Sequence, residues 1–305
     1  MESSIPVDFS LLNWSINSTV TRGLKNIQNT CFINSTLQCL LYTPPIQNIP
    51  HTCSKKYCTL SLLKELFASD SKVPEKFHQL IYTKTKKFTK DQQEDAHETL
   101  RFLIEHIYPK TIGDFIFGGT LQSSVRCKKC SYESVVLEDF LDLSLEVTHF
   151  TLEDCLKNFC KKETLDGNNK CYCSSCKKST EAYKQFLISA TPIVLTFHLK
   201  RFGNNGIKDK SNMTFPEKLD LKQFTKLRRK EEYELYAVLV HTGRSCKAGH
   251  YYCYIKGPDS LWYLANDLII SKSDLKKVLN DRSAYIIFYK KITEKGLPKK
   301  RRKYA

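Results

Sequence analysis

Two pairs of cysteines with the spacing Cys-x-x-Cys constrain the fold of this chain more than any other feature. The first pair is Cys127 and Cys130, and the second is Cys173 and Cys176, which starts 43 residues after Cys130. Tetrahedral coordination by four thiolates needs two such pairs, and polar residues inside each pair suit a closed structural site. We therefore predict that the two turns meet around one structural Zn²⁺, which supports folding of the strands that carry them.

Other interpretations of these cysteines are weaker. The chain has thirteen cysteines, an odd number, and without a secretory signal such spacing indicates a metal rather than disulfides. A redox role is disfavoured because neither pair lies in a βαβ unit. Four free thiols are the plain alternative, and Cys171, just ahead of the second pair, is a candidate substitute ligand.

The composition indicates a globular protein. A chain of 305 residues with 41% hydrophobic content corresponds to about one or two domains of ~150 residues, or to one larger domain. The same content excludes a disordered or collagen-like chain. No segment approaches the ~20 apolar residues that a membrane span needs, and the N-terminus has no basic segment followed by an apolar block. We expect a soluble intracellular monomer that does not bind membranes.

The apolar pattern changes from helical to extended along the chain. A helix is expected to start at Asn29 or Thr30 and to end before Pro44 and Pro45. From about Gly118 the spacing changes to short β-branched and alternating runs separated by turns. Further helices are expected at 60–67, 96–107 and 152–159. The sequence therefore predicts an α+β fold, with helices first and strands after them.

The positive charge of the chain is concentrated at its C-terminus. Net charge is +16, and residues 299–303 read KKRRK after a proline. Such a run is typical of a nuclear-import signal or of a patch that contacts nucleic acid or chromatin. The alternative is a solvated terminus that aids solubility.

Cys31 lies at the expected start of the first helix. A helix N-terminus favours a thiolate through its dipole and free N–H groups, and the thiolate is the nucleophilic form of cysteine. The same N–H groups help to hold the oxyanion of an acyl-transfer intermediate, and the side-chain amide of Asn26 is a further candidate donor. The alternative is an ordinary buried thiol.

A histidine on a predicted hairpin is the candidate partner of this thiol. Residues 249–255 alternate like a strand, and residues 261–266 follow a Gly-Pro-Asp turn. If paired positions sum to 516, His250 faces Asn266; if they sum to 517, it faces Asp267. Either side chain would orient the imidazole so that its other nitrogen takes the thiol proton, and the sequence leaves the register open.

The sequence around both residues resembles a known family. Residues 23–38 (GLKNIQNTCFINSTLQ) resemble the cysteine box of the ubiquitin-specific proteases, and residues 249–252 (GHYY) with 262–267 (WYLAND) resemble their histidine box. Two further segments are similar to family signatures, 92–98 (QQEDAHE) and 199–202 (LKRF). The resemblance extends over about 23–289, and residues 42–45 (YTPP) look most like a nuclear and nucleolar branch of the family.

The resemblance implies a papain-like cysteine peptidase fold shaped as a hand, with a helical thumb, a β palm and zinc-ribbon fingers that cradle ubiquitin. It divides the chain into a leader at 1–20, a catalytic domain at 21–291 and a basic tail at 292–305. Within the domain we expect the thumb at about 21–117, the fingers at about 118–188 and the palm at about 189–291.

The resemblance also implies a deubiquitinase, which hydrolyses the isopeptide or peptide bond at the C-terminal glycine of ubiquitin through an acyl-enzyme. By motif, Cys31 is the nucleophile, His250 the general base, Asn266 the residue that orients it, and Asn26 an oxyanion donor. Asp267 is the alternative orienting residue.

Two acidic residues are candidates for binding the substrate. Asp95 and Glu98 are three residues apart on one helix face and match family positions that contact the arginine-bearing tail of ubiquitin. The alternative is an acidic pair at a helix N-terminus that complements the dipole.

Two positions depart from the family pattern. Gln28 replaces the glycine usual before Asn-Thr-Cys, which strains or shifts the loop if that position needs a positive φ. Cys171 stands where a tyrosine is common. Rival functions are a catalytically weak ubiquitin-binding pseudoenzyme, suggested by Gln28, and a zinc-ribbon module that binds nucleic acid, suggested by the basic tail.

Overall fold

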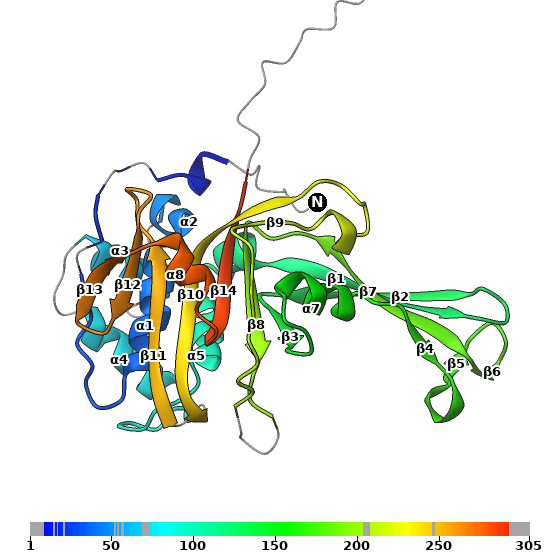
Figure 1. Cartoon of the computed structure of the whole chain (residues 1–305). Coiled ribbons are helices and arrows are strands. Elements are labelled where there is room, and N and C mark those ends of the chain that lie inside the picture. Colours follow the sequence, from blue (N-terminus) through cyan, green and yellow to red (C-terminus); the bar gives the residue numbers. More distant parts are fainter. Residues whose placement is uncertain are drawn as a thin grey trace, which may run out of the picture.

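The computed structural model describes residues 9–292 apart from 15, 17, 21, 52, 54, 56–57, 69–72, 204–207 and 246–247. Within that part, no helix is both long and apolar enough to cross a bilayer. The KKRRK run at 299–303 lies outside the described residues. Figure 1 shows helices on one side, a large central sheet, and a long β arm that extends away from both.

Helices dominate the first third of the described chain, as the sequence predicts. They are α1 (Cys31–Leu41), α2 (Pro44–Asn48), α3 (Thr59–Phe67), α4 (Val73–Lys84), α5 (Ala96–Glu105) and α6 (Lys110–Phe117). Two later helices are α7 (Leu152–Phe159) and α8 (Leu275–Leu279), and short 3-10 turns occur at η1 (Phe9–Leu12), η2 (Gly167–Asn169) and η3 (Lys222–Phe224).

Helix α1 is the centre of the helical layer. All of its residues are buried, because it lies between α5 on one side and strand β11 (Ala248–Lys256) on the other. It ends at Leu41, and Pro44 and Pro45 do not only follow it but begin α2. Proline is tolerated in the first turn of a helix, where its missing N–H has no intrahelical partner.

A mostly antiparallel sheet of eight strands forms the middle of the molecule. Its strand order is β13-β12-β11-β10-β14-β8-β3, with β9 paired to β10, and only β3 and β8 run parallel. The strands are β3 (Leu143–Glu146), β8 (Val194–Lys200), β9 (Lys218–Asp220), β10 (Glu232–Ser245), β11, β12 (Trp262–Asn266), β13 (Ile269–Ser273) and β14 (Ala284–Lys291).

The middle strands of this sheet, β8, β10 and β14, are buried on both faces. Along β10, Ala237 and Leu239 pack with the helical layer, whereas Val238 and Val240 pack in a second cluster that includes Leu156 of α7. Successive strand residues point to opposite faces, so one strand supplies both clusters. On β11, the alternate residues Tyr251, Cys253 and Ile255 belong to the same cluster as the residues of α1, which holds β11 against this helix.

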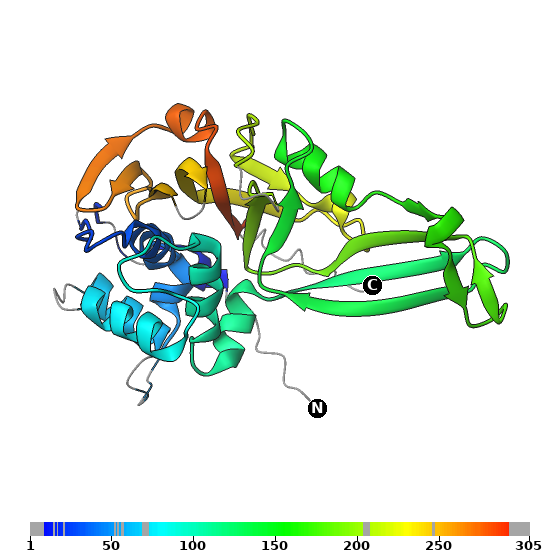
Figure 2. The same cartoon turned by 90° about the horizontal axis from the view of Figure 1, so that it is seen from below.

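The arm is a second sheet with strand order β2-β1-β7-β4. Its strands are β1 (Gly119–Cys127), β2 (Glu133–Phe140), β4 (Glu163–Leu165) and β7 (Ala182–Ala190), and a small pair, β5 (Cys171–Cys173) and β6 (Lys178–Thr180), lies at its tip. Figure 2 shows the same arm from below, again directed away from the helices. The predicted α+β class and the order of helices before strands are therefore confirmed.

Candidate active site

Cys31 is the first residue of α1 and lies against β11. Cys31 is buried, with only 2% of its surface exposed. Burial raises the pKa of the Cys31 thiol, a hydrogen bond with the Tyr251 backbone lowers it, and the Asp267 carboxylate raises it further; the net pKa is above its ordinary value. At neutral pH the thiol is therefore protonated in this structure, and it needs a base to become a nucleophile.

The loop before Cys31 has a left-handed backbone at two residues that are not glycine. Gln28 has φ 53° and Asn29 has φ 66°. Asparagine tolerates this conformation better than glutamine does, because its short side chain hydrogen-bonds locally. The side chain of Asn29 is also held in place, because its Nδ2 donates to the carbonyl oxygen of Asp91 in the loop before α5 at 3.0 Å. The position of Gln28 therefore does use a positive φ, where glycine would carry no strain.

Asn26 closes this loop with both ends of its amide. Its Oδ1 accepts from the backbone N–H of Thr30 at 2.9 Å, and its Nδ2 donates to Oδ2 of Asp267 at 2.9 Å. A side-chain amide nitrogen carries two hydrogens, so one N–H remains for another acceptor.

His250 of β11 is hydrogen-bonded to Asn266 at the end of β12. The distance from Nε2 of His250 to Oδ1 of Asn266 is 2.6 Å, whereas Nε2 is 4.0 Å from Oδ2 of Asp267. With the amide oxygen as acceptor, Nε2 carries the hydrogen and Nδ1 holds the free lone pair. The structure thus favours Asn266 over Asp267 as the partner of the imidazole.

Both hairpin registers considered from the sequence are wrong. Paired residues of β11 and β12 sum to 518, as in Cys253 opposite Ala265. The turn is one in which Gly257 N–H donates to the Leu261 carbonyl at 2.8 Å and Ser260 has φ 65°, which leaves three residues in the loop. His250 lies beyond this ladder and pairs with Thr242 of β10 instead, so its ring reaches Asn266 without facing it directly.

Asp267 connects the hairpin to the cysteine loop. Its Oδ1 accepts from Nδ2 of Asn34 in α1 at 2.8 Å, and its carbonyl oxygen accepts from Leu24 N–H at 2.8 Å. A Cβ on Gly23 would lie 2.0 Å from the carbonyl oxygen of Leu268, so only glycine permits this close approach. Sequence reasoning missed Asn34, although it lies one helical turn after Cys31.

The thiol and the imidazole lie on adjacent elements but are not bonded. In the described part of the chain, no hydrogen bond joins Sγ of Cys31 to the ring of His250, whose side chain is 38% exposed. The thiol instead interacts with the backbone of Tyr251, the residue after His250. Catalytic hydrogen bonds often tighten only when substrate binds, and this neighbourhood allows that adjustment.

A buried histidine supports the start of β11. Burial, and then the charge of Lys208, lower the pKa of His241 to about 3, so its ring is neutral. A Cβ on Gly249 would lie 2.6 Å from Nε2 of His241 and 2.2 Å from the Thr242 carbonyl oxygen, which explains a glycine before His250. Gln93 approaches the same ring at 3.4 Å. Sequence reasoning also missed His241.

A cavity of about 400 Å³ opens beside the cysteine loop. Its wall combines the loop before α1, the loop before α5 and the start of β11. The lining residues are Asn29, Asp91, Gln92, Gln93, Ala248 and Gly249. Its polar wall and its position beside the loop that precedes Cys31 suit a narrow peptide segment.

The two acidic candidates differ in their surroundings. Asp95 is the N-cap of α5: its carboxylate accepts from His97 N–H at 2.7 Å and from the Tyr285 hydroxyl at 2.8 Å. Glu98 is exposed and lines a separate cavity with Arg101. In the described residues neither is hydrogen-bonded to Cys31 or His250.

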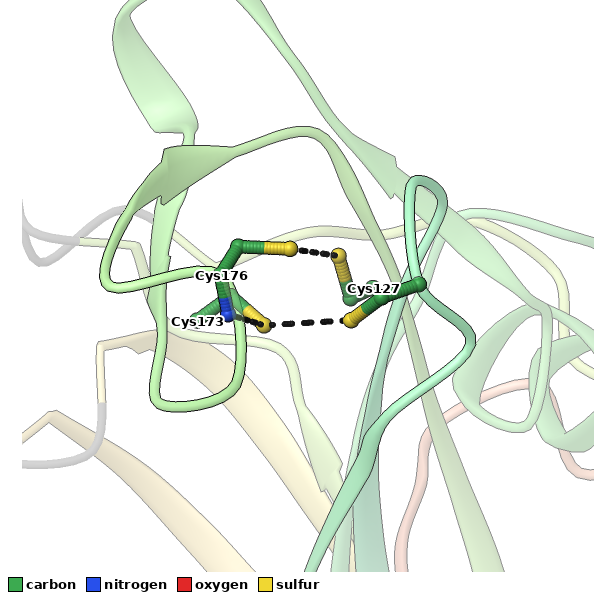
Figure 3. A group of neighbouring side chains, drawn as sticks. Cys127, Cys173 and Cys176 are labelled. Atoms are coloured by element: carbon green, nitrogen blue, oxygen red, sulfur yellow. Dashed lines mark hydrogen bonds between the residues drawn. The ribbon is translucent and has the colours of Figure 1, made fainter.

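The four predicted metal ligands converge at the tip of the arm. All four sulfur atoms lie within 4.8 Å of one another, with Cys130 and Cys173 3.6 Å apart and Cys127 and Cys176 4.0 Å apart. Tetrahedral zinc with bonds of about 2.3 Å needs sulfur atoms about 3.8 Å apart, so these four residues could hold a metal ion. Figure 3 shows the sulfur atoms of the two turns directed toward one another.

Backbone geometry at the two turns supports the same conclusion. Each Cys-x-x-Cys turn is followed by a residue with positive φ, Ser131 at 60° and Lys177 at 55°. In each, this residue donates its N–H to the carbonyl oxygen of the first cysteine. Cys171 is not part of the four-sulfur group and pairs with Thr180 in the β5–β6 ladder.

Comparison with known proteins identifies relatives over nearly the whole described chain. A family model described as ubiquitin carboxyl-terminal hydrolase matches residues 22–289. Human ubiquitin carboxyl-terminal hydrolase 42 is 37% identical over 93% of this chain and 24% of its own length. Ubiquitin carboxyl-terminal hydrolase 25 of Arabidopsis thaliana is 34% identical over 94% of this chain and 50% of its own. The chain thus spans 24% and 50% of the lengths of these two relatives.

Solved structures of ubiquitin-bound proteins are also similar to this chain. One is the SAGA Ubp8/Sgf11/Sus1/Sgf73 DUB module bound to ubiquitin aldehyde, with a TM-score of 0.79 and 27% identity over 89% of this chain and 70% of that one. Another is the same module with a substituted Ubp8, bound to monoubiquitin, with a TM-score of 0.79 and 28% identity over 89% of this chain and 69% of that one.

Proposed function

The chain belongs to the ubiquitin carboxyl-terminal hydrolase family, and from this premise we propose that it is a deubiquitinase. Its fold is the papain-like catalytic fold of the ubiquitin-specific proteases. The proposed reaction is thiol-dependent hydrolysis of the isopeptide or peptide bond at the C-terminal glycine of ubiquitin. The observation that carries this proposal is the 2.6 Å bond between His250 and Asn266, which leaves Nδ1 of the imidazole free as a base beside α1 and Cys31.

The proposed reaction starts from a neutral thiol. When the ubiquitin tail occupies the cleft, Nδ1 of His250 takes the proton of Cys31, and sulfur attacks the carbonyl carbon of the terminal glycine. The remaining N–H of Asn26 helps to stabilise the oxyanion, because its Oδ1 and its other N–H are already held by Thr30 and Asp267. The imidazolium then protonates the leaving amine as the C–N bond breaks.

The resulting thioester is hydrolysed in the second half of the reaction. His250 removes a proton from water, the hydroxyl attacks the thioester carbonyl, and the thiol leaves with the proton returned. Throughout, Asn266 holds the imidazole in one tautomer. Asp267 joins Asn26 and Asn34 to the hairpin through hydrogen bonds. The enclosure of Cys31 suits the narrow Gly-Gly end of ubiquitin.

We also propose that Asp95 and Glu98 contact the basic part of the ubiquitin tail. Glu98 is exposed and available for an arginine. Asp95 is held by His97 and Tyr285, which fixes its carboxylate at the start of α5. A fixed carboxylate loses little conformational freedom when it pairs with a guanidinium.

The arm is proposed to be the fingers, with Cys127, Cys130, Cys173 and Cys176 as ligands of a structural zinc ion. When bound, zinc would supply four coordination bonds that join the end of β1 to the β5–β6 pair. We propose 21–117 as the thumb, 189–291 as the palm and 118–188 as the fingers, apart from β3 and α7, which pack with the central sheet.

Localisation in the nucleus is a further proposal, supported by the KKRRK sequence at 299–303 and by the SAGA module among the similar structures. Contact of this tail with nucleic acid or chromatin stays a prediction, as does a monomeric state. The Ubp8 neighbour was solved in a module with Sgf11, Sus1 and Sgf73, bound to ubiquitin aldehyde.

A fluorogenic ubiquitin C-terminal substrate tests the proposed activity. We expect turnover by the full chain, loss of turnover in Cys31→Ala, and normal turnover in the matched control Cys171→Ser. Absence of turnover by the intact folded protein would contradict the proposal.

One observation favours a second candidate, a ubiquitin-binding protein with weak turnover. Gln28 has a left-handed backbone in the loop before Cys31. In the described residues the Cys31 thiol is not hydrogen-bonded to His250, as a catalytic pair would be. Binding of ubiquitin without hydrolysis in the same assay would select this candidate, and tight salt-sensitive RNA binding without ubiquitin affinity would select a nucleic-acid module.

A further inference from the structure

A second group of metal-binding side chains lies in the helical layer. His51, Cys53 and Cys58 belong to the segment between α2 and α3, and their ligand atoms all lie within 4.8 Å of one another. His51 and Cys53 are partly buried, and Cys58 is fully buried. The proposed chemistry at Cys31 uses none of these three residues.

The spacing of this group suits a tetrahedral zinc ion. Nε2 of His51 lies 3.3 Å from Sγ of Cys58. With Zn–S and Zn–N bonds of about 2.3 and 2.0–2.1 Å, a nitrogen and a sulfur at the tetrahedral angle lie about 3.5 Å apart. The agreement is as good as in the four-cysteine cluster, where sulfur pairs are 3.6 and 4.0 Å apart.

The ligand set leaves one coordination position for a small molecule. Ser61 occupies the position that the second cysteine of a Cys-x-x-Cys pair starting at Cys58 would have. Its Oγ lies 3.1 Å from Nε2 of His51. One imidazole and two thiolates are a known zinc ligand set when water fills the fourth position. The Ser61 hydroxyl is placed to hold such a water.

The position of Cys58 favours the form of cysteine that binds zinc. Cys58 is the N-cap residue of α3, where free backbone N–H groups and the helix dipole stabilise a thiolate. A simple hydrogen bond between the thiol and His51 is the alternative. That alternative needs a separate thiol contact between Cys53 and Cys58 to bring in the third residue, whereas one metal ion accounts for the convergence of all three.

We propose that His51, Cys53 and Cys58 bind a second zinc ion, which fixes the start of α3. The other end of this helix contacts the cysteine loop, because Arg22 donates to the Leu66 carbonyl at 2.9 Å. The Arg22 carbonyl in turn accepts from Gln38 of α1 at 2.7 Å. Zinc at this site therefore stabilises the support of α1, outside the proposed catalytic groups.

Zinc content of the purified full chain tests the proposal without depending on activity. Measured by mass spectrometry of the metal, the intact protein should lose one zinc per chain in His51→Ala and in the double variant Cys53→Ser/Cys58→Ser. The exposed His149 offers the matched control, since His149→Ala should keep the full content. The double variant Cys127→Ser/Cys130→Ser should lose a different zinc, so that the losses add when the changes are combined.

Cobalt substitution covers the case in which a cysteine variant fails to fold. Loaded with Co²⁺, the Cys127→Ser/Cys130→Ser protein should still show the absorption of a tetrahedral thiolate site, and a further His51→Ala change should remove it. Equal zinc content in His51→Ala and the intact protein would overturn the proposal. So would a Cys53–Cys58 disulfide found after alkylation of the intact protein without reductant.

Discussion

Nε2 of His250 lies 2.6 Å from Oδ1 of Asn266, although the hairpin does not place the two residues opposite each other. The bond assigns the ring hydrogen to Nε2 and leaves Nδ1 as the base. Asp267, one residue further, is instead bonded to Asn26 and Asn34. Two neighbouring residues thus have separate tasks: one orients the imidazole, and the other joins the hairpin to the cysteine loop.

Replacing Asn266 by alanine should lower kcat/KM for a ubiquitin substrate by on the order of 10²-fold, because the imidazole loses its fixed tautomer. Asn266→Asp should retain most of the activity, since a carboxylate oxygen accepts the same Nε2–H. Steady-state kinetics of both variants check this. Equal losses in the two variants would show that the side chain acts by packing alone.

The reactivity of Cys31 toward iodoacetamide should reveal its raised pKa. Because alkylation needs the thiolate, its rate should rise with pH through a pKa above the ordinary thiol value, mainly as a result of burial. Asp267→Asn removes a negative charge that raises this pKa, so the profile should move to lower pH. Mass spectrometry of the Cys31 peptide measures the alkylation rate at each pH. Asp139→Asn on the distant arm is the control. A profile that moves to higher pH in Asp267→Asn would contradict a charge effect of Asp267 on Cys31.

Gln28→Gly should stabilise the protein. A side chain in the left-handed conformation costs about 1–2 kcal/mol, and glycine costs about 0.5–1 kcal/mol in entropy, so the net gain is at most about 1.5 kcal/mol. Urea unfolding measures the change. Asn29→Gly is the control and should gain less, because asparagine tolerates this backbone; destabilisation by Gln28→Gly would show that its side chain makes a needed contact.

Loss of one cysteine ligand in the arm should unfold its tip and spare the catalytic groups. A structural zinc ion contributes about 10–16 kcal/mol in small domains, so Cys173→Ser should strongly increase amide exchange in β5 and β6. Amides of α1 and β11 should keep their protection, and KM should rise more than kcat falls. Uniform exchange across the chain in Cys173→Ser would instead indicate that the arm and the sheet unfold together.

Local patterns predicted a large part of this structure. The spacing of Ile33, Leu37, Leu40 and Leu41 indicates α1, and the segment 152–159 was assigned to a helix with the bounds that the structure has. These predictions depend on neighbouring residues only. The family was recognised from short motifs and is confirmed by the comparisons.

Predictions that needed relationships across the chain were less complete. The register of β11 and β12 depends on the turn at Gly257–Leu261, where Ser260 takes a positive φ that no glycine signals. His241 is one of several strand histidines in the sequence, and only the fold brings it against Gly249. The four ligand cysteines were identified because a metal site imposes its own spacing, whichever strands lie between the pairs.

Reaction with a ubiquitin that carries a C-terminal electrophile tests the central proposal most directly. We expect one covalent adduct per chain, mapped to Cys31 by peptide mass spectrometry and absent from Cys31→Ala. Modification of another cysteine, or no adduct although ubiquitin binds, would contradict the assignment of Cys31 as the nucleophile.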